Sequence, residues 1–220
     1  MINRILAIES SSTICGVSII ESGLVLSLVE ESAHRKHAEI LPGFIKNALR
    51  KSNKIINDID AIAVSIGPGS FTGLRIGLGM AKGLAYSHNL PIIPVPTLVA
   101  IAFGLQEYQP KNGLAYSHGN KVFYQEFIWE NDLPSFKQKP EVGDLENFRE
   151  KIDSSSFQWN CDSILDNSNK FYTGTPSAKD VGLLAFHQKN VWAKQKPYTL
   201  VPDYIAPFEI QLKKKFLRRF

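Results

Sequence analysis

A glycine-rich stretch between residues 65 and 83 constrains the fold of this chain more than any other segment. An apolar run, Ala61 to Ile66, ends in the turn Gly67-Pro68-Gly69, and an amphipathic segment with four further glycines follows at once. This order predicts a strand, a tight loop and a helix from about Phe71 to Ser87. Such a loop can turn bare backbone N–H groups toward an anion or toward a closely packed neighbour.

The segments around this stretch predict an α/β lobe with a mixed sheet and flanking helices. Three antiparallel strands open the chain, and helices and strands alternate after them, which is the order of a ribonuclease-H-like lobe. The predicted elements are strands at 4–8, 15–20 and 24–30, a helix at 40–49 with Pro42 in its first turn, a strand at 61–66, the glycine-rich helix, a strand at 91–95 and a helix at 98–106.

The second half of the chain carries weaker patterns. A polar stretch with Pro110 and Gly113 marks a boundary, and a hairpin at 114–129, a short helix at 144–152 and a helix at 177–189 capped by Ser177 are expected beyond it. We therefore expect three parts. They are a first lobe at 1–106, a smaller second lobe at 107–200, and a basic segment at 201–220 that returns to the first lobe.

The glycines of the predicted helix indicate close approach of another backbone, because each interior glycine costs about 1 kcal/mol relative to alanine. That backbone belongs either to the same lobe or to a partner chain. The helix at 40–49 is apolar at six of ten positions, wide enough to contact a sheet and a second helix. We expect at least one helix face to dock a partner; full enclosure within one molecule is the alternative. The predicted interface residues are Leu41, Ile45, Leu49, Leu74, Ile76, Gly77, Leu78, Met80 and Ala81.

Composition narrows the classes of protein. The chain has an apolar fraction of 44%, a net charge of +4 and a pI of about 9.0, so it tolerates an RNA partner without requiring one. No apolar run reaches the ~18–20 residues of a membrane helix, and the first strand is too short for a signal peptide, so we expect a cytoplasmic protein. Much of the positive charge lies in residues 213–220.

The sequence shows no complete catalytic set. The spacing of His34 and His37 lacks a third metal ligand, and Cys15 and Cys161 are read as reduced thiols outside any metal-ligand spacing. The glycine-rich loop matches neither the phosphate-binding motif of P-loop enzymes nor the nucleophile turn of hydrolases. Glu9 ends the first strand, where actin-like ATPases hold a metal-bound phosphate, but no glycine follows it to let the backbone close on a phosphate.

Two motifs give the chain a resemblance to a known family. Ile5-Leu6-Ala7-Ile8-Glu9-Ser10-Ser11, followed by Gly67-Pro68-Gly69-Ser70-Phe71-Thr72-Gly73-Leu74-Arg75-Ile76-Gly77, resembles the TsaB (YeaZ) family, a glycoprotease-like family related to actin-like ATPases. The resemblance implies two actin-like lobes, the second degenerate. It assigns a glycine-rich loop at Gly67, Pro68, Gly69, Ser70, Phe71, Thr72, Gly73 and Arg75, and makes Glu9 a vestigial phosphate-loop carboxylate.

The resemblance also implies a function without catalysis by this chain. Family members bind a catalytic TsaD paralogue through first-lobe helices, here about 38–52 and 71–87, and a TsaE-type ATPase joins them. The complex transfers threonylcarbamoyl to the adenosine next to the anticodon of tRNA. ATP and metal belong to the partner subunits, and this chain binds no cofactor or metal alone. When the paralogue is absent, the unoccupied apolar helix surface favours pairing of the isolated chain with itself.

Three positions depart from the family pattern, and two other functions remain open. The family has Asp at Glu9, Asp-Ala-Arg at Tyr116-Ser117-His118, and Tyr-Leu-Arg at Tyr204-Ile205-Ala206. One alternative is a glycoprotease-type peptidase, motivated by the histidines at 34 and 37. The other is an actin-like sugar kinase or ATPase, motivated by the carboxylate at the end of the first strand and by the order of the lobe.

Overall fold

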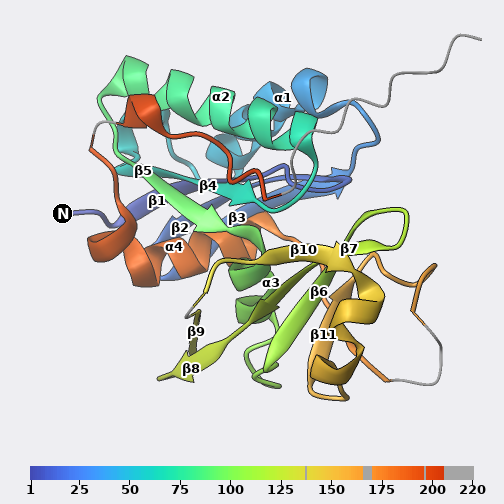
Figure 1. Ribbon diagram of the computed structural model, residues 1–220. Coiled ribbons are helices and arrows are strands. Elements are labelled where there is room, and N and C mark those ends of the chain that lie inside the picture. The colour runs from blue at the N-terminus through green and yellow to red at the C-terminus, as the bar shows by residue number, and fades with distance from the viewer. Residues whose placement is uncertain (137, 166–169, 196, 206–220) are drawn as a thin grey trace, which may run out of the picture.

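Two five-stranded mixed sheets organise the chain (Figure 1). The computed structural model describes residues 1–136, 138–165, 170–195 and 197–205. The first sheet contains β1 (Arg4–Glu9), β2 (Ile14–Glu21), β3 (Leu24–Ser32), β4 (Ala61–Gly67) and β5 (Ile92–Pro96) in the order β3-β2-β1-β4-β5. The strands β1, β2 and β3 are antiparallel, and β4 and β5 run parallel to β1. The predicted ribonuclease-H-like order is confirmed.

Helices cover both faces of the first sheet, as Figure 1 shows. The helices α1 (His37–Lys51) and α2 (Phe71–His88) lie on one face, and α3 (Thr97–Gly104) and α4 (Ala178–Trp192) lie on the other. Strand β1 sends Leu6 and Ile8 into the core under α1 and α2, and Ile5 and Ala7 into the core under α3 and α4, because alternate side chains point to opposite faces. Burial on both faces explains why β1 and β4 are almost continuously apolar.

The second sheet repeats the strand order of the first. Its members are β6 (Asn112–His118), β7 (Lys121–Glu126), β10 (Glu141–Asp144), β11 (Ser156–Trp159) and β12 (Tyr172–Thr173) in the order β10-β7-β6-β11-β12. If the strands of each sheet are numbered from 1 to 5 along the chain, both sheets have the order 3-2-1-4-5. In both, strands 4 and 5 run parallel to strand 1. The second lobe is thus a copy of the same topology, which the sequence did not reveal as a repeat.

The second lobe is the thinner one. Where α1 stands in the first lobe, the second has a 3₁₀ helix, η2 (Leu145–Lys151), and the described residues between β11 and β12 form no helix. A small ribbon of β8 (Ile128–Glu130) and β9 (Leu133–Ser135) completes it, and the remaining 3₁₀ turns are η1 (Ile56–Asp58) and η3 (Pro197–Thr199). Helix α3 is buried along 97–103 and lies between the two sheets, where one cluster joins its side chains to those of both.

Helix α4 departs from the predicted lobe boundaries. The predicted second lobe ran to residue 200, but α4 packs on β1, β2 and β5 of the first sheet, and Ser18 Oγ donates to the Ala178 carbonyl at 2.7 Å. Residues 201–205 also lie against the first lobe, where the Asp203 N–H donates to the Ile66 carbonyl at 2.8 Å. The rest of the predicted basic segment, 206–220, lies outside the described residues.

Other boundaries differ by small, explicable amounts. Helix α1 begins at His37 rather than Ile40, so Pro42 lies within the helix beyond its first turn. The predicted helix at 144–152 is the 3₁₀ helix η2, while the hairpin turn at Gly119 and the Ser177 cap of α4 are as expected. No helix in the described ranges combines the length and apolar character that a membrane crossing needs.

Candidate functional site

The turn between β1 and β2 fits into a glycine notch on α2. A Cβ at Gly73 or at Gly77 would collide with Ser10, and the Ser10 hydroxyl donates to the Gly73 carbonyl at 3.0 Å. At the start of the loop, a Cβ on Gly69 would collide with the Ser11 carbonyl. These three glycines therefore serve close approach inside the lobe, which is the internal alternative that the sequence had left open.

The loop turns its backbone donors inward. The Gly67 N–H donates to Thr97 Oγ1 at 3.2 Å, and the Ser70 N–H donates to the Ser11 carbonyl at 2.6 Å. The Ser70 hydroxyl caps α2 by accepting from the Gly73 N–H at 3.2 Å. Three N–H groups of the loop are thus satisfied within the first lobe.

Glu9 ends β1 as a fully buried carboxyl. Its Oε1 accepts from the Ser11 N–H and, at 2.6 Å, from the Ser11 hydroxyl, while its Oε2 has no hydrogen-bond partner. Desolvation raises the pKa of Glu9 from 4.5 to about 7, and the Ser11 bonds oppose that rise. The carboxyl is therefore used to close its own turn.

The predicted partner interface requires a correction. Six of the nine predicted residues are buried within the lobe, namely Leu41, Ile45, Leu74, Gly77, Leu78 and Ala81. The other three, Leu49, Ile76 and Met80, are half-buried. The apolar stripe of each helix therefore faces the core of its own lobe, as it does in an amphipathic surface helix. A partner cannot reach the six buried residues without unfolding the lobe.

A smaller apolar surface faces outward on the same two helices. We call it the outer face and define it by half-buried side chains that pack over the core under α1 and α2: Ile40, Phe44, Ile76, Met80 and Leu84. Two exposed glycines of α2, Gly79 and Gly83, have open space where a Cβ would stand. A neighbouring helix could approach closely there. Ile40, Phe44 and Leu84 were not among the predicted interface residues, although the first two belong to the apolar stripe of the helix predicted at 40–49.

A cleft of about 1140 Å³ lies between the two lobes. Its first-lobe wall is the β1–β2 turn, the segment before α1 and the glycine-rich loop, and its second-lobe wall comes from the ends of β6, β11 and β12. Both walls include the carboxyl ends of parallel strands, where α/β proteins place their ligands. Glu9 itself is fully buried beneath the turn.

Residues 203–205 close one side of the cleft against the start of α2. The Arg75 guanidinium lies 3.8 Å from the centre of the Phe71 ring, and its Nε donates to the Tyr204 hydroxyl at 2.8 Å. The rings of Phe71 and Tyr204 are 4.8 Å apart, so the three side chains form one stack.

The histidines and cysteines considered from the sequence as metal ligands do not form a metal site. His37 is buried at the start of α1 with Nε2 3.2 Å from the Ile14 carbonyl oxygen, and His34 is exposed. Across the ranges that the structure describes, no three His, Cys, Asp or Glu side chains gather as metal ligands do. Cys15 and Cys161 are free and buried, and burial raises the pKa of each thiol to about 12.

Comparisons with known proteins find matches in two groups, TsaB and TsaD. The family model of TsaD, tRNA N6-adenosine threonylcarbamoyltransferase, matches residues 28–126. The tRNA threonylcarbamoyladenosine biosynthesis protein TsaB of Haemophilus influenzae is 32% identical over 175 residues, which are 78% of this chain and 71% of that protein. The tRNA N6-adenosine threonylcarbamoyltransferase of Staphylococcus saprophyticus is 43% identical over 107 residues, 41% of this chain and 31% of the enzyme. The solved structure of YeaZ from Pseudomonas aeruginosa shares the fold, with a TM-score of 0.79, 20% identity, and coverage of 92% of this chain and 100% of that one.

Proposed function

Because the chain belongs to the TsaB family of tRNA threonylcarbamoyladenosine biosynthesis proteins, we propose that it is a non-catalytic subunit of that tRNA-modifying machinery. Its task is to hold a catalytic TsaD-type paralogue in an active form while that paralogue transfers threonylcarbamoyl to the adenosine beside the anticodon. A TsaE-type ATPase joins the pair, and ATP and metal bind to the partner subunits. The work takes place on tRNA in the cytoplasm.

The closed turn after β1 is the observation that carries this proposal. An actin-like phosphate site needs open backbone donors and a carboxylate free to face a metal ion. In this chain Glu9 accepts bonds from Ser11, and the turn itself is occupied by the glycine notch of α2. The Ser10 N–H also donates inward, to Ser65 Oγ at 3.4 Å. Chemistry on a nucleotide therefore has no prepared place beside this carboxyl.

The outer face is the proposed docking surface for the paralogue. The region similar to TsaD, residues 28–126, contains both helices that carry this face. A paralogue with the same lobe presents corresponding helices, so the two chains can pair face to face about an approximate twofold axis. The same geometry lets two copies of this chain pair when the paralogue is missing. The apolar side chains supply burial, and the two open glycines allow the helices to approach closely.

Reconstitution with the TsaD-type and TsaE-type partners tests the proposal. Met80→Glu places a charge on the outer face, and we expect it to abolish co-elution with the paralogue and to reduce tRNA modification at least tenfold. Leu24→Glu is the matched control, because Leu24 is 69% exposed on β3, away from α2. Full modification activity of the paralogue in the absence of this chain would reject the proposed role.

A further inference from the structure

Aromatic side chains from separate parts of the chain meet at the cleft. Phe71 begins α2, Tyr116 lies near the end of β6, Trp159 ends β11, and Tyr204 belongs to the segment that closes one side. All four are half-buried or exposed, so each keeps part of its ring at the surface. The cleft volume of about 1140 Å³ exceeds the room that one small ligand fills. These features favour a ligand with several flat rings.

Basic groups line the same cleft. His34 and the exposed Arg35 come from the loop before α1, and His118 comes from the β6–β7 hairpin. The two acidic residues of the lining are occupied within the chain. Asp162 accepts from Gln158 Nε2 at 2.8 Å, and Asp203 lies 3.9 Å from Lys139 Nζ. Arg35 therefore remains as the exposed cation of the lining for an anionic ligand.

Phe71 and Tyr204 show how flat side chains pack at the cleft. Both line it, their tilted rings are 4.8 Å apart, and the Arg75 guanidinium lies over the Phe71 ring. Aromatic faces and guanidinium planes are the surfaces on which unstacked RNA bases rest, with phosphates held by nearby basic side chains. A free nucleotide held by its phosphates would instead need the backbone cradle that the β1–β2 turn has closed.

We propose that the interlobe cleft binds the unstacked bases of a single-stranded RNA loop, with Tyr116 and Trp159 as stacking surfaces and Arg35 as a phosphate contact. This inference rests on the proposed function, which supplies a tRNA as the RNA. It gives the chain a direct contact with the substrate, in addition to its contact with the paralogue. The second lobe then has a role of its own, since it provides both stacking side chains.

The first test measures tRNA affinity of the reconstituted complex by fluorescence anisotropy. Loss of one stacked base weakens binding about fivefold or more, so Trp159→Ala and Tyr116→Ala should each weaken binding by about that factor. Arg35→Ala should weaken binding and lower its salt dependence. The matched controls are Tyr108→Ala and Lys51→Ala, an exposed aromatic and an exposed cation outside the cleft, and both should bind as the unchanged protein does.

Folding and partner binding are measured on the same samples by thermal unfolding and by co-elution with the paralogue. A Trp159→Ala complex that assembles normally and binds tRNA at full affinity overturns the inference and leaves the proposed function intact. If the chain fails to bind the paralogue at all, the proposed function fails, and the cleft is still tested on the isolated chain. The probe is then a single-stranded anticodon-loop oligonucleotide carrying 4-thiouridine, and the expected crosslinks lie in 116–118 or 159–162.

Two further arms separate this site from other sources of binding. A chain ending at residue 205 lacks the basic residues at 213–219, and it should still show the effect of Trp159→Ala. Loss of all RNA binding on that truncation, with no effect of Trp159→Ala in the full chain, assigns binding to the basic segment and overturns the inference. Binding of adenosine monophosphate without binding of the oligonucleotide also overturns it.

Discussion

The two lobes share one strand order and differ in what covers it. In the first lobe, helices lie on both faces of the sheet, and α2 alone has 18 residues. In the second lobe, the 3₁₀ helix η2 has seven residues and covers one face with Leu145 and Phe148. The difference shows that the order of strands can be kept while the helices change. The two candidate surfaces therefore have different origins. The helices of the first lobe form the outer face, and the strand ends of both lobes form the cleft.

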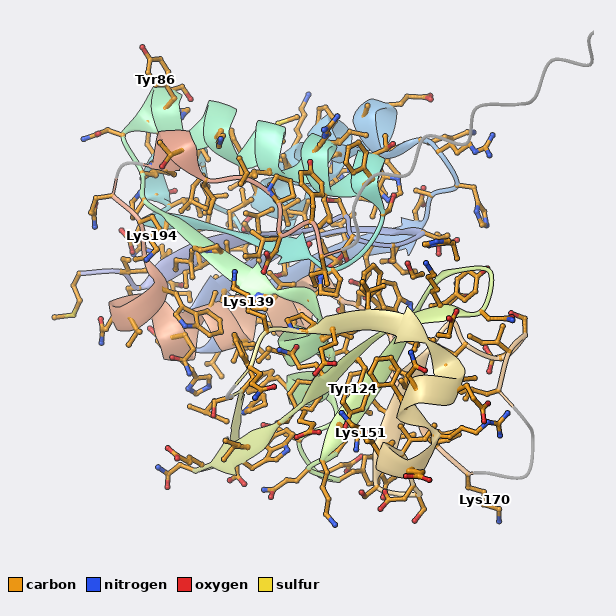
Figure 2. All side chains as sticks on the ribbon, in the orientation of Figure 1. Tyr86, Tyr124, Lys139, Lys151, Lys170 and Lys194 are labelled. Atoms are coloured by element: carbon orange, nitrogen blue, oxygen red, sulfur yellow. The ribbon has the colours of Figure 1, made fainter. Side chains whose placement is uncertain are left out.

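In the second lobe, the side chain of Lys151 helps to cover the apolar surface that η2 leaves open. Its ammonium group lies 5.3 Å from the centre of the Tyr124 ring and 5.8 Å from that of Phe148, and Figure 2 labels Lys151 and Tyr124 in the second lobe. The two rings stack at 4.7 Å. A long cationic side chain thus helps to cover apolar surface that a helix covers in the first lobe.

Truncation of a core side chain should give the largest difference in unfolding free energy between the two lobes. Leu74→Ala removes a side chain of α2 that is 1% exposed, and we expect a loss of about 4 kcal/mol of unfolding free energy. Leu145→Ala removes a side chain of η2 that is 8% exposed, and we expect a loss of about 2 kcal/mol, because the thin cover can relax around the gap. Denaturant unfolding measures both, and equal losses would contradict the difference drawn between the lobes.

Substitution of a glycine in the notch on α2 should have the next largest effect on unfolding free energy. Gly73→Ala should destabilise the chain by about 3 kcal/mol, because the new Cβ collides with the Ser10 carbonyl oxygen. Gly83→Ala, on the open side of the same helix, should stabilise the isolated chain by about 1 kcal/mol through helix propensity. Unfolding curves of the two variants provide the measurement. A loss of stability at Gly83 would mean that the outer side of α2 is also closely packed.

The buried carboxyl at the end of β1 should make the stability of the chain depend on pH. The native chain holds the Glu9 proton more tightly than the unfolded chain, so unfolding free energy falls as pH rises from about 4.5 through about 7. Glu9→Gln should remove that fall and raise stability at pH 8 by on the order of 2 kcal/mol. His118, which ends β6 at the corresponding place, is exposed, and His118→Gln serves as the control. Parallel pH profiles of Glu9→Gln and the unchanged chain would refute the assignment.

The smallest expected effect tests the cover of the second lobe. Lys151→Ala should cost about 0.5–1 kcal/mol, because the cation and its stem leave the rings of Tyr124 and Phe148. Lys170→Ala is the control, since Lys170 is exposed in the same lobe. If the two variants have the same midpoint of thermal unfolding, the side chain of Lys151 does not contribute to the cover.

The helices and strands of the first lobe could be predicted because each has a clear pattern within a short stretch of sequence. The strands β1 to β4 are long and apolar, and Gly67 to Gly69 separate a strand from a helix, so element type and order follow from short windows of sequence. The strands β8 to β12 of the second lobe have two to four residues each, too short to show an alternating pattern in the sequence. Helix α4 was assigned to the wrong lobe because nothing in its own sequence says which sheet it covers.

The candidate site was predicted in outline and missed in detail. The glycine-rich loop and its helix were found, but Leu41 and Leu74 were expected to face a partner and instead fill the core. A helical stripe marks burial and does not tell which neighbour does the burying. The cleft could not be predicted, because Tyr116 and Trp159 come together with His34 only through the packing of one lobe on the other.

The return of α4 to the first sheet has a consequence for synthesis of the chain. The buried side chains of the core under α1 and α2 all belong to residues 6–92, whereas the core on the opposite face of the sheet includes side chains of α4, which ends at residue 192. Until α4 has been synthesised, the nascent protein exposes the apolar side chains that α4 covers. The face that carries the proposed docking surface can therefore form early, and a stalled or truncated translation product that lacks α4 would be a target for chaperones and proteases.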